Sequence, residues 1–248
     1  MNKKPLLLHI PHASRTIPDE YKNDYMADLS DELCQLTDWY TDELFDFDTS
    51  KVVFPISRLV CDVERFRDDR REEMFRCGMG TCYTHGYKGT LIRSLSEKRK
   101  EAILKRWYDP HHDLLKAETN RILDKFGVCF IVDCHSFSAT PLPYETNKTD
   151  NRPDICIGTD HFHTPKPMAE RLVTFFLQRG YSVEVNTPFS GTMVPLSYYH
   201  TNTNVISVMI EVNRGLYLDD SFHKAPTFST LKQTITAAIY DLMNWAGY

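Results

Sequence analysis

The stretch Val128-Cys-Phe-Ile-Val-Asp-Cys-His-Ser-Phe137 decides the fold of this chain. Its first part, residues 128–132, is a continuous apolar run, which is typical of a central strand buried on both faces of a sheet. An acid, an imidazole and a hydroxyl follow at once in Asp133, His135 and Ser136. The sequence therefore predicts a buried strand whose carboxyl end leads into a loop that carries polar chemistry.

Further strands and helices alternate on both sides of this stretch. Short apolar runs predict strands at 6–10, 52–54, 59–63, 155–157, 182–185 and 205–212. Apolar residues at helical spacing predict helices at 30–44, 96–125, 167–179 and 231–245, with Pro110 dividing or kinking the second. The polar, glycine-punctuated residues 66–94 predict a loop that helps to cover a site. This order favours one domain over 1–248, a three-layer α/β/α fold with a mixed, mostly parallel central sheet.

Composition excludes several classes of function. The chain has 248 residues, a formal net charge of -5, 42% hydrophobic and 25% charged residues, which is typical of a soluble globular protein. Its basic residues are scattered, except for a run from Arg65 to Arg71 that acids interrupt, so nucleic acid is not an expected partner. The three-leucine run at 6–8 is too short for a membrane span or a signal peptide.

Cysteine usage indicates a reducing compartment. The seven cysteines form an odd set without a CxxC pair, and several stand in predicted buried strands, so we expect a cytoplasmic protein. Cys77 and Cys82 surround a glycine-rich turn. They are a conceivable metal pair, but we interpret them as loop thiols.

Four side chains at predicted strand ends indicate where the site lies. In open α/β sheets, ligands bind outside the carboxyl ends of the strands. The four are His12, Arg65, His135 and Glu211. His9 and His12 point to opposite faces if the segment is extended, so we expect only His12 to reach the site.

The chemistry of these residues leaves alternatives open. His135 suits a zinc ligand with Asp133 as its orienting partner, or it is a strand-end histidine bonded to a carbonyl. Glu211 ends an apolar strand, where a carboxylate is costly unless it binds metal, activates water or pairs with an arginine such as Arg214. Arg58 and Arg65 suit a bidentate clamp on a substrate carboxylate, or they form surface salt bridges.

The chain resembles the N-formylglutamate amidohydrolase family over nearly its whole length. The resemblance rests on six motifs in order and on the segment Asn186-Thr-Pro-Phe189-Ser-Gly191-Thr192, which is similar to the family's glycine-containing segment before its last central strand. In chain order, the motifs are Pro11-His12-Ala13, Thr37-Asp38-Trp39 with Asp42, Ser57-Arg58 with Asp62 and Arg65, Pro110 with His112, Asp133-Cys-His135-Ser136, and Glu211.

The resemblance implies hydrolysis of an N-acyl amino acid, typically N-formyl-L-glutamate to glutamate and formate, the last step of one histidine-degradation route. It also implies a phosphorylase/hydrolase-like α/β/α fold related to zinc carboxypeptidases and aspartoacylases. In those relatives a histidine after a central strand binds zinc, a later strand-end glutamate is the general base and an arginine binds substrate. His135, Glu211 and Arg65 match these roles.

At two positions this chain differs from the related enzymes, and both differences affect the hypothesis. Those relatives take two ligands from His-x-x-Glu, whereas Arg15 stands three residues after His12. We therefore expect one zinc ion on His12, Asp38 and His135. Many family members read Asp-Leu-Asn-Arg where this chain reads Asp62-Val-Glu64-Arg65, and the added carboxylate is expected to affect substrate choice.

The expected substrate is a small anionic N-acyl amino acid. Glu211 would take the proton and Arg65 would polarise the carbonyl, while Arg58 or Arg65 holds the substrate carboxylate. The remaining expected substrate-binding residues are Ser136, Asn186, Thr192 and His112. The rival hypotheses are a zinc peptidase or deacylase for short peptides or cell-wall fragments, and a non-catalytic binding protein on the same fold.

Overall fold

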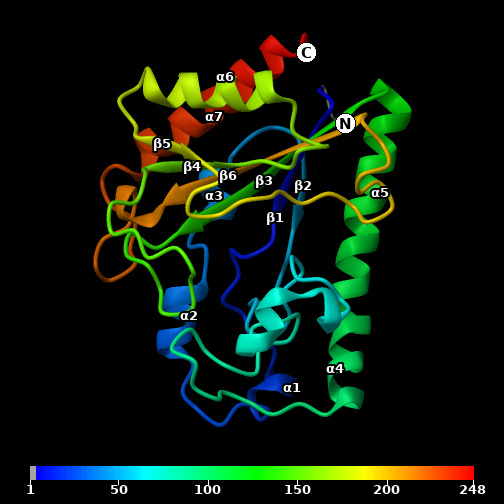
Figure 1. Ribbon diagram of the computed structural model, residues 1–248, viewed down its shortest axis with the longest axis vertical. Helices are drawn as coiled ribbons and strands as arrows, with labels where there is room; N and C mark the ends of the chain where they lie inside the picture. The colour runs from blue at the N-terminus through cyan, green and yellow to red at the C-terminus, as the bar shows by residue number, and fades with distance from the viewer. Residues whose placement is uncertain (1–3) are drawn as a thin grey trace.

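A six-stranded mixed sheet forms the centre of the molecule. Figure 1 shows the computed structural model, which describes residues 4–248. The strand order is β2-β1-β3-β6-β4-β5, and only the pairing of β4 with β6 is antiparallel. The strands are β1 (Leu6–Ile10), β2 (Ser50–Val53), β3 (Cys129–Phe137), β4 (Ile155–Gly158), β5 (Val183–Val185) and β6 (Val205–Asn213). The sequence prediction of a mixed, mostly parallel sheet is confirmed.

Helices cover both faces of the sheet and complete three layers (Figure 1). Helices α6 (Lys166–Leu177) and α7 (Phe228–Trp245) pack on one face, together with α3 (Thr41–Leu44). Helix α5 (Asp109–Phe126) packs on the other face through Leu115 and Ile122. Because β3 and β6 lie between the two helical layers, their side chains are buried almost without exception.

The side chains facing α5 change from apolar to polar along each central strand. On the opposite face β3 stays apolar to Cys134 and β6 to Val212. On the α5 face, β3 runs from Ile131 to Asp133 and His135, and β6 runs from Val205 through Ser207 to Glu211. The strand register sets His135 beside Glu211. The polar side chains of β3 and β6 therefore lie together on the face towards α5, at the carboxyl ends of the two strands.

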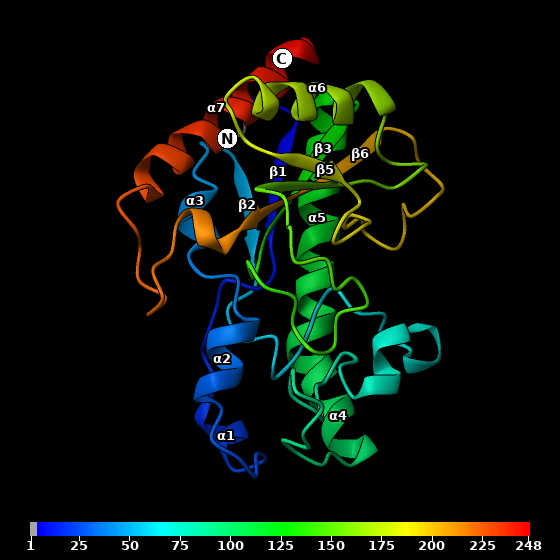
Figure 2. The same cartoon turned by 60° about the vertical axis from the view of Figure 1, so that its left-hand side comes forward.

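A second group of elements lies beyond this polar end of the sheet (Figure 2). It contains α1 (Asp19–Lys22), α2 (Ser30–Leu36) and α4 (Glu97–Ile103), and the loops between residues 54 and 96. The loops include short 3-10 turns at Asp69–Arg71 and Glu73–Cys77, and a third such turn, Arg214–Leu216, follows β6. Two apolar clusters of their own hold these elements together.

The expected loop thiols fall in this second group. Cys77 is exposed, Cys82 is buried in one of the two apolar clusters, and all seven thiols are free. Phe66 and Met74, from the predicted loop at 66–94, line a cavity described below. That part of the loop therefore does border the site.

The long helix predicted at 96–125 is continuous through its proline. A π-helical turn, Leu104–Tyr108, joins α4 to α5, and Pro110 stands in the first turn of α5. The wider turn leaves room for the proline ring, which an α-helical turn would not accept without a kink. The predicted division at Pro110 is thus wrong, although the backbone does change its geometry there.

Three other predictions about local structure are wrong. The apolar run 59–63 is buried but forms turns and not a strand. The predicted helix 30–44 is two helices separated at 37–40, so Asp38 lies between two helices and not within one. Strand β3 continues to Phe137, so His135 lies in the strand and not in a loop after it.

Among residues 4–248, no helix combines the length and apolar character needed to cross a bilayer.

Candidate functional site

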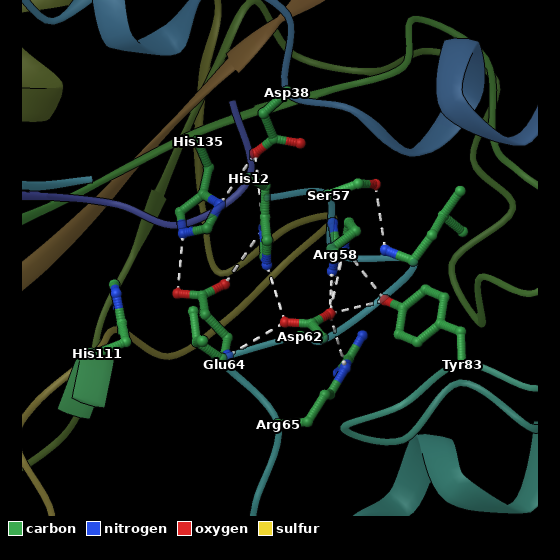
Figure 3. Close-up of polar contacts among 12 residues, drawn as sticks. His12, Asp38, Ser57, Arg58, Asp62, Glu64, Arg65, Tyr83, His111 and His135 are labelled. Atoms are coloured by element: carbon green, nitrogen blue, oxygen red, sulfur yellow. Dashed lines mark hydrogen bonds and ion pairs between the residues drawn. The ribbon is translucent and has the colours of Figure 1, made fainter. Parts of the chain in front are cut away.

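Two buried histidines converge where the α5 face of the sheet ends (Figure 3). His12 follows β1 directly and His135 stands near the end of β3, with 2% and 3% of their surfaces exposed. Their ring centroids lie 5.2 Å apart. The two predicted imidazoles, 123 positions apart in the sequence (135 − 12), therefore face one small volume.

A carboxylate orients each of these imidazoles from outside that volume. Asp62 Oδ1 lies 2.9 Å from His12 Nε2, and Asp133 Oδ1 lies 3.2 Å from His135 Nε2. Asp133 is itself held by His9 Nδ1 at 2.7 Å and by the backbone N–H of Met193 at 2.8 Å. Metal-binding histidines commonly have such a partner, because a carboxylate fixes the tautomer and the ring orientation.

Two further carboxylates, Asp38 and Glu64, face the histidines directly. Asp38 Oδ2 lies 3.0 Å from His135 Nδ1 and 3.9 Å from His12 Nδ1. Glu64 Oε1 lies 3.0 Å from His135 Nε2, and Glu64 Oε2 lies 3.6 Å from His12 Nδ1. His12, Glu64 and His135 each offer one ligand atom within 4.8 Å of the others.

The polar atoms at this point suit a divalent cation. His12 Nδ1 is buried and has no hydrogen-bond partner, although it faces both carboxylates. Burial would lower the pKa of His135, but Glu64 and Asp133 raise it well above its usual value. Negative charge is thus in excess around two imidazoles, which are good zinc ligands together with carboxylates. The donor set fits a divalent cation and contains more acidic groups than three ligands require. The group whose ligand atoms all lie within 4.8 Å of one another contains Glu64, and the predicted ligand Asp38 stands outside it.

Asp62 connects the histidines to the arginines of the site. Its Oδ2 accepts hydrogen bonds from Arg58 Nη2 at 2.8 Å and from the Tyr83 hydroxyl at 2.7 Å, and Arg65 Nε lies 3.5 Å away. Burial would raise the pKa of this carboxyl, but Arg58 and His12 hold it well below its usual range. Asp62 is therefore charged and holds together the loop that carries Glu64 (Figure 3).

Glu211 is a buried acid in a different electrostatic state. Burial raises its pKa to about 8, and the neighbouring Asp38 and Glu64 oppose the effect of His135. Its Oε2 is buried without a hydrogen-bond partner. In the absence of a cation, Glu211 therefore holds its proton near neutral pH, and a cation beside it would favour the carboxylate.

These groups open into a cavity of about 410 Å³, a volume suited to a small molecule. Arg58, Arg65, Glu211, Ser136 and Thr192 line it together with His12 and His135.

His112 also lines the cavity, and its Nε2 lies 2.8 Å from the carbonyl oxygen of Val63. Burial lowers its pKa to about 4, so this histidine is neutral and donates that hydrogen bond. Asn186 does not line the cavity, because its side chain is exposed and bonded to Thr159 at both ends. The structure therefore separates Asn186 from the other predicted substrate-binding residues.

Comparison with known proteins now identifies the family. The sequence profile of the N-formylglutamate amidohydrolase family matches residues 4–218. The chain belongs to the N-formylglutamate amidohydrolase family. It is 27% identical over 260 residues to an N-formylglutamate deformylase of Pseudomonas putida, which covers 95% of this chain and 92% of that protein.

Solved structures show the same fold as this member of the amidohydrolase family. The crystal structure of an N-formylglutamate amidohydrolase from Ralstonia eutropha JMP134 has a TM-score of 0.83 at 19% identity, covering 99% of this chain and 95% of that one. A gene product of Agrobacterium tumefaciens has a TM-score of 0.69 at 20% identity, covering 97% of this chain and 92% of that one. The predicted α/β fold and the family resemblance are both confirmed.

Arg15, the residue that departs from the expected His-x-x-Glu pattern, does not line the cavity. Its guanidinium lies over the ring of Trp39, 4.2 Å from the centroid. Asp38 stands next to that tryptophan in the sequence, and its backbone N–H donates to the carbonyl of His12 at 3.0 Å. Residues 37–40 thus bring the Asp38 carboxylate close to His12 and His135.

Sequence reasoning missed that Glu64 faces the histidines and that Arg214 and Tyr144 line the cavity. Glu64 was expected to act beside Arg65 only. The signal available for it was weak, because a two-residue spacing from Asp62 gives a common face only in an extended chain, whereas the chain turns at Val63 and Glu64.

Proposed function

We propose that this chain hydrolyses the amide bond of an N-acyl amino acid with one bound zinc ion. N-formyl-L-glutamate or a similar N-formyl or N-acyl acidic amino acid is the proposed substrate. The observation that carries the proposal is the unpaired, buried Nδ1 of His12, which faces two carboxylates and lies beside His135. Membership of the family and the deformylase relative support the reaction class.

The proposed ligands are His12, Asp38 and His135. One oxygen of Asp38 faces the Nδ1 atoms of both histidines, whereas Glu64 approaches them through different oxygens. With His135 binding through Nδ1, its Nε2 remains for Asp133, just as Asp62 holds Nε2 of His12. Both imidazoles then present the same nitrogen, each with its own orienting carboxylate.

A zinc ion bound there supplies polarisation of the scissile carbonyl and acidification of the attacking water. Glu211 supplies the proton acceptor, because it lines the same cavity with a free oxygen. It would accept the proton of the water and deliver it to the leaving amine. Its raised pKa in the metal-free protein suits a group that must both take and return a proton.

Arg65 is the better placed of the two predicted arginines for a substrate carboxylate or the carbonyl oxygen. Both arginines line the cavity, but Arg58 already uses Nε and Nη2 to hold Asp62. Arg65 Nε makes no hydrogen bond, and the ion pairs of Arg65 with Asp62 and Glu72 are longer, at 3.5 and 3.7 Å. We therefore assign Arg65 to the substrate and Arg58 to the support of Asp62, with His112, Ser136 and Thr192 on the cavity wall.

A direct test measures formate and amine release from a panel of N-formyl and N-acyl amino acids, with and without a chelator. We expect hydrolysis of acidic substrates that a chelator abolishes and added zinc restores. Preference for short peptides or cell-wall fragments would instead support the peptidase alternative. Glu211→Gln should lower kcat by about 10²- to 10⁴-fold, the usual contribution of a general base.

The matched control is Glu184→Gln, since Glu184 is an exposed glutamate on the edge strand β5. Its kinetics should equal those of the unmodified protein. Protein without bound metal, combined with no change on Glu211→Gln, would leave only the binding-protein alternative.

The ligand assignment has its own test in the metal content of two variants. Asp38→Asn should lose the zinc. Glu64→Gln should keep it, because an amide in place of the Glu64 carboxylate would leave the proposed ligand set intact. The reverse result would make Glu64 the third ligand and Asp38 the partner that orients His135.

A further inference from the structure

A second cluster of metal-binding side chains lies outside the cavity. Asp160, His161 and His200 each offer one ligand atom within 4.8 Å of the others. Asp160 and His161 follow β4, whereas His200 lies in the segment that connects β5 to β6, shortly before β6 begins. His200 Nε2 lies 2.9 Å from Asp160 Oδ2, and the rings of His161 and His200 have centroids 4.7 Å apart. None of the three lines the cavity.

Asp160 is held in place before any ion binds. Its Oδ1 accepts hydrogen bonds from the backbone N–H groups of Phe162 and His163, at 2.8 and 2.9 Å. Its own backbone N–H donates to Thr164 Oγ1 at 2.9 Å. These contacts leave Oδ2 to face His200, so the carboxylate is already oriented as a ligand.

His200 is fixed by its backbone as well as by its side chain. It has a φ of 53°, in the left-handed region that histidine adopts only occasionally. Its N–H donates to Nε2 of the buried His163 at 2.8 Å, while His163 Nδ1 bonds to the carbonyl of Val205 at 2.7 Å. The His163 ring thus anchors the backbone that presents His200 to Asp160.

His161 takes no part in the ion pair between Asp160 and His200. Asp160 and His200 already form a pair without it, while His161 contacts the ring of His200 and lies within ligand distance of both residues. An exposed histidine edge-on to another histidine, beside an oriented carboxylate, matches the ligand set of a borderline transition metal. Magnesium and calcium prefer oxygen ligands and do not match.

We propose that Asp160, His161 and His200 form a second site for a divalent transition metal such as Zn²⁺, Ni²⁺ or Cu²⁺, with water completing the coordination. An ion there joins the loop after β4 to the segment before β6. That segment contributes residues 188–194, Leu196 and Tyr199 to the cavity wall, and Tyr199 stacks on His200 with centroids 3.9 Å apart. The ion therefore stiffens one wall of the cavity without touching the substrate.

The test is a calorimetric titration of Zn²⁺ and Ni²⁺ into full-length protein whose catalytic site has first been saturated with zinc. We expect one further equivalent in the unmodified protein. His161→Ala and His200→Ala should weaken this equivalent by more than about tenfold, the loss that removal of an orienting partner alone already brings at metal sites. Because His161 is exposed, His161→Ala should keep the circular dichroism and the melting temperature of the metal-free protein.

His223→Ala is the matched control. His223 is exposed and also faces an aspartate, with Nδ1 3.7 Å from Asp219 Oδ2, but no second histidine belongs to that pair among the described residues. This variant should bind the further equivalent unchanged.

Nitrogen hyperfine splitting in the electron paramagnetic resonance spectrum of added Cu²⁺ gives a second measurement. Coupling to two imidazoles should fall to one in His161→Ala. An unchanged titration in His161→Ala, or no binding beyond the catalytic equivalent, would overturn the second site. Because the comparison is between variants, it gives its answer whether or not the proposed hydrolysis is found.

Discussion

The strand-held half of the site and its loop-held half are built by different forces. His135 and Glu211 stand in β3 and β6, where a ladder of backbone hydrogen bonds fixes their positions. Glu64 and Arg65 stand in a loop that has no ladder, and Asp62 holds it by accepting bonds from His12, Arg58, Tyr83 and the N–H of Glu64. Backbone hydrogen bonds therefore position the strand-held half, whereas the side chain of Asp62 positions the loop-held half.

The largest effect should follow removal of the Asp62 charge. Asp62→Asn breaks the pair between the fully buried Asp62 and Arg58, whose side chain is only 14% exposed, and leaves that guanidinium without its anion, so we expect a loss of about 3–5 kcal/mol in the free energy of unfolding. Urea denaturation measures it. Asp241→Asn, which breaks a partly exposed pair with Arg171, should cost no more than about 1 kcal/mol. Equal losses in both variants would remove the special role of Asp62.

The strand-held half should show its electrostatic cost in the pH dependence of stability. The pKa of Glu211 in the metal-free folded protein is raised from 4.5 to about 8. Between these values the unfolded chain releases the proton while the folded protein keeps it, so rising pH favours unfolding. The metal-free protein should therefore lose stability relative to Glu211→Gln from pH 5 to pH 8, by at least about 2 kcal/mol.

Thermal or urea unfolding of both proteins at several pH values, in the presence of a chelator, gives this difference. Zinc should reduce it, since a nearby cation favours the charged carboxylate. A constant difference across the pH range would show that Glu211 titrates normally.

A smaller effect is expected where the strand-held half supports the metal indirectly. Asp133→Asn removes the negative charge that orients His135 through Nε2, so zinc affinity should fall by about 10- to 100-fold. Competition with a chelating dye measures the affinity. Asp154→Asn is the control, because Asp154 lies just before β4, where its Oδ2 accepts only from the backbone of Ser182. An unchanged affinity in Asp133→Asn would indicate that His135 binds through Nε2 instead.

The smallest effect should come from Arg15. Arg15→Lys weakens its stacking on Trp39 and should cost at most about 1 kcal/mol in stability. Zinc content, measured by atomic absorption, should stay the same. Lost zinc in this variant would mean that the departure from His-x-x-Glu shapes the metal site after all.

The strand-held half was largely predictable from the sequence, for a physical reason. Apolar runs such as 6–10 and 205–212 mark segments buried on both faces, and β1 and β6 match or extend them by one residue. The polar residues that end these runs then lie at the carboxyl edge of the sheet, as predicted for His12, His135 and Glu211. Periodicity and strand order suffice for this half.

The loop-held half was not predictable, because the apolar run 59–63 indicated burial, and burial alone does not distinguish a strand from a buried loop. Leu59, Val60 and Val63 are fully buried, yet no neighbouring strand accepts them. The buried guanidinium of Arg93 bonds to the carbonyls of Leu59 and Val60, at 2.8 and 2.9 Å, and so replaces the missing ladder. No local sequence pattern predicts that an arginine 33 residues after Val60 will bond to these carbonyls. Glu64 follows in the same loop, and its place beside the histidines was missed.

The change from apolar to polar side chains along one face of β3 and β6 also separates two kinds of evolutionary constraint. Positions 133, 135, 209 and 211 line the cavity, while positions such as Cys134 and Ile210 on the opposite face pack in the cluster that contains α6 and α7. Substitutions in the first set would change the chemistry of the cavity and leave the packing of α6 and α7 as it is. Divergence of activity in such a protein therefore needs no reorganisation of its interior.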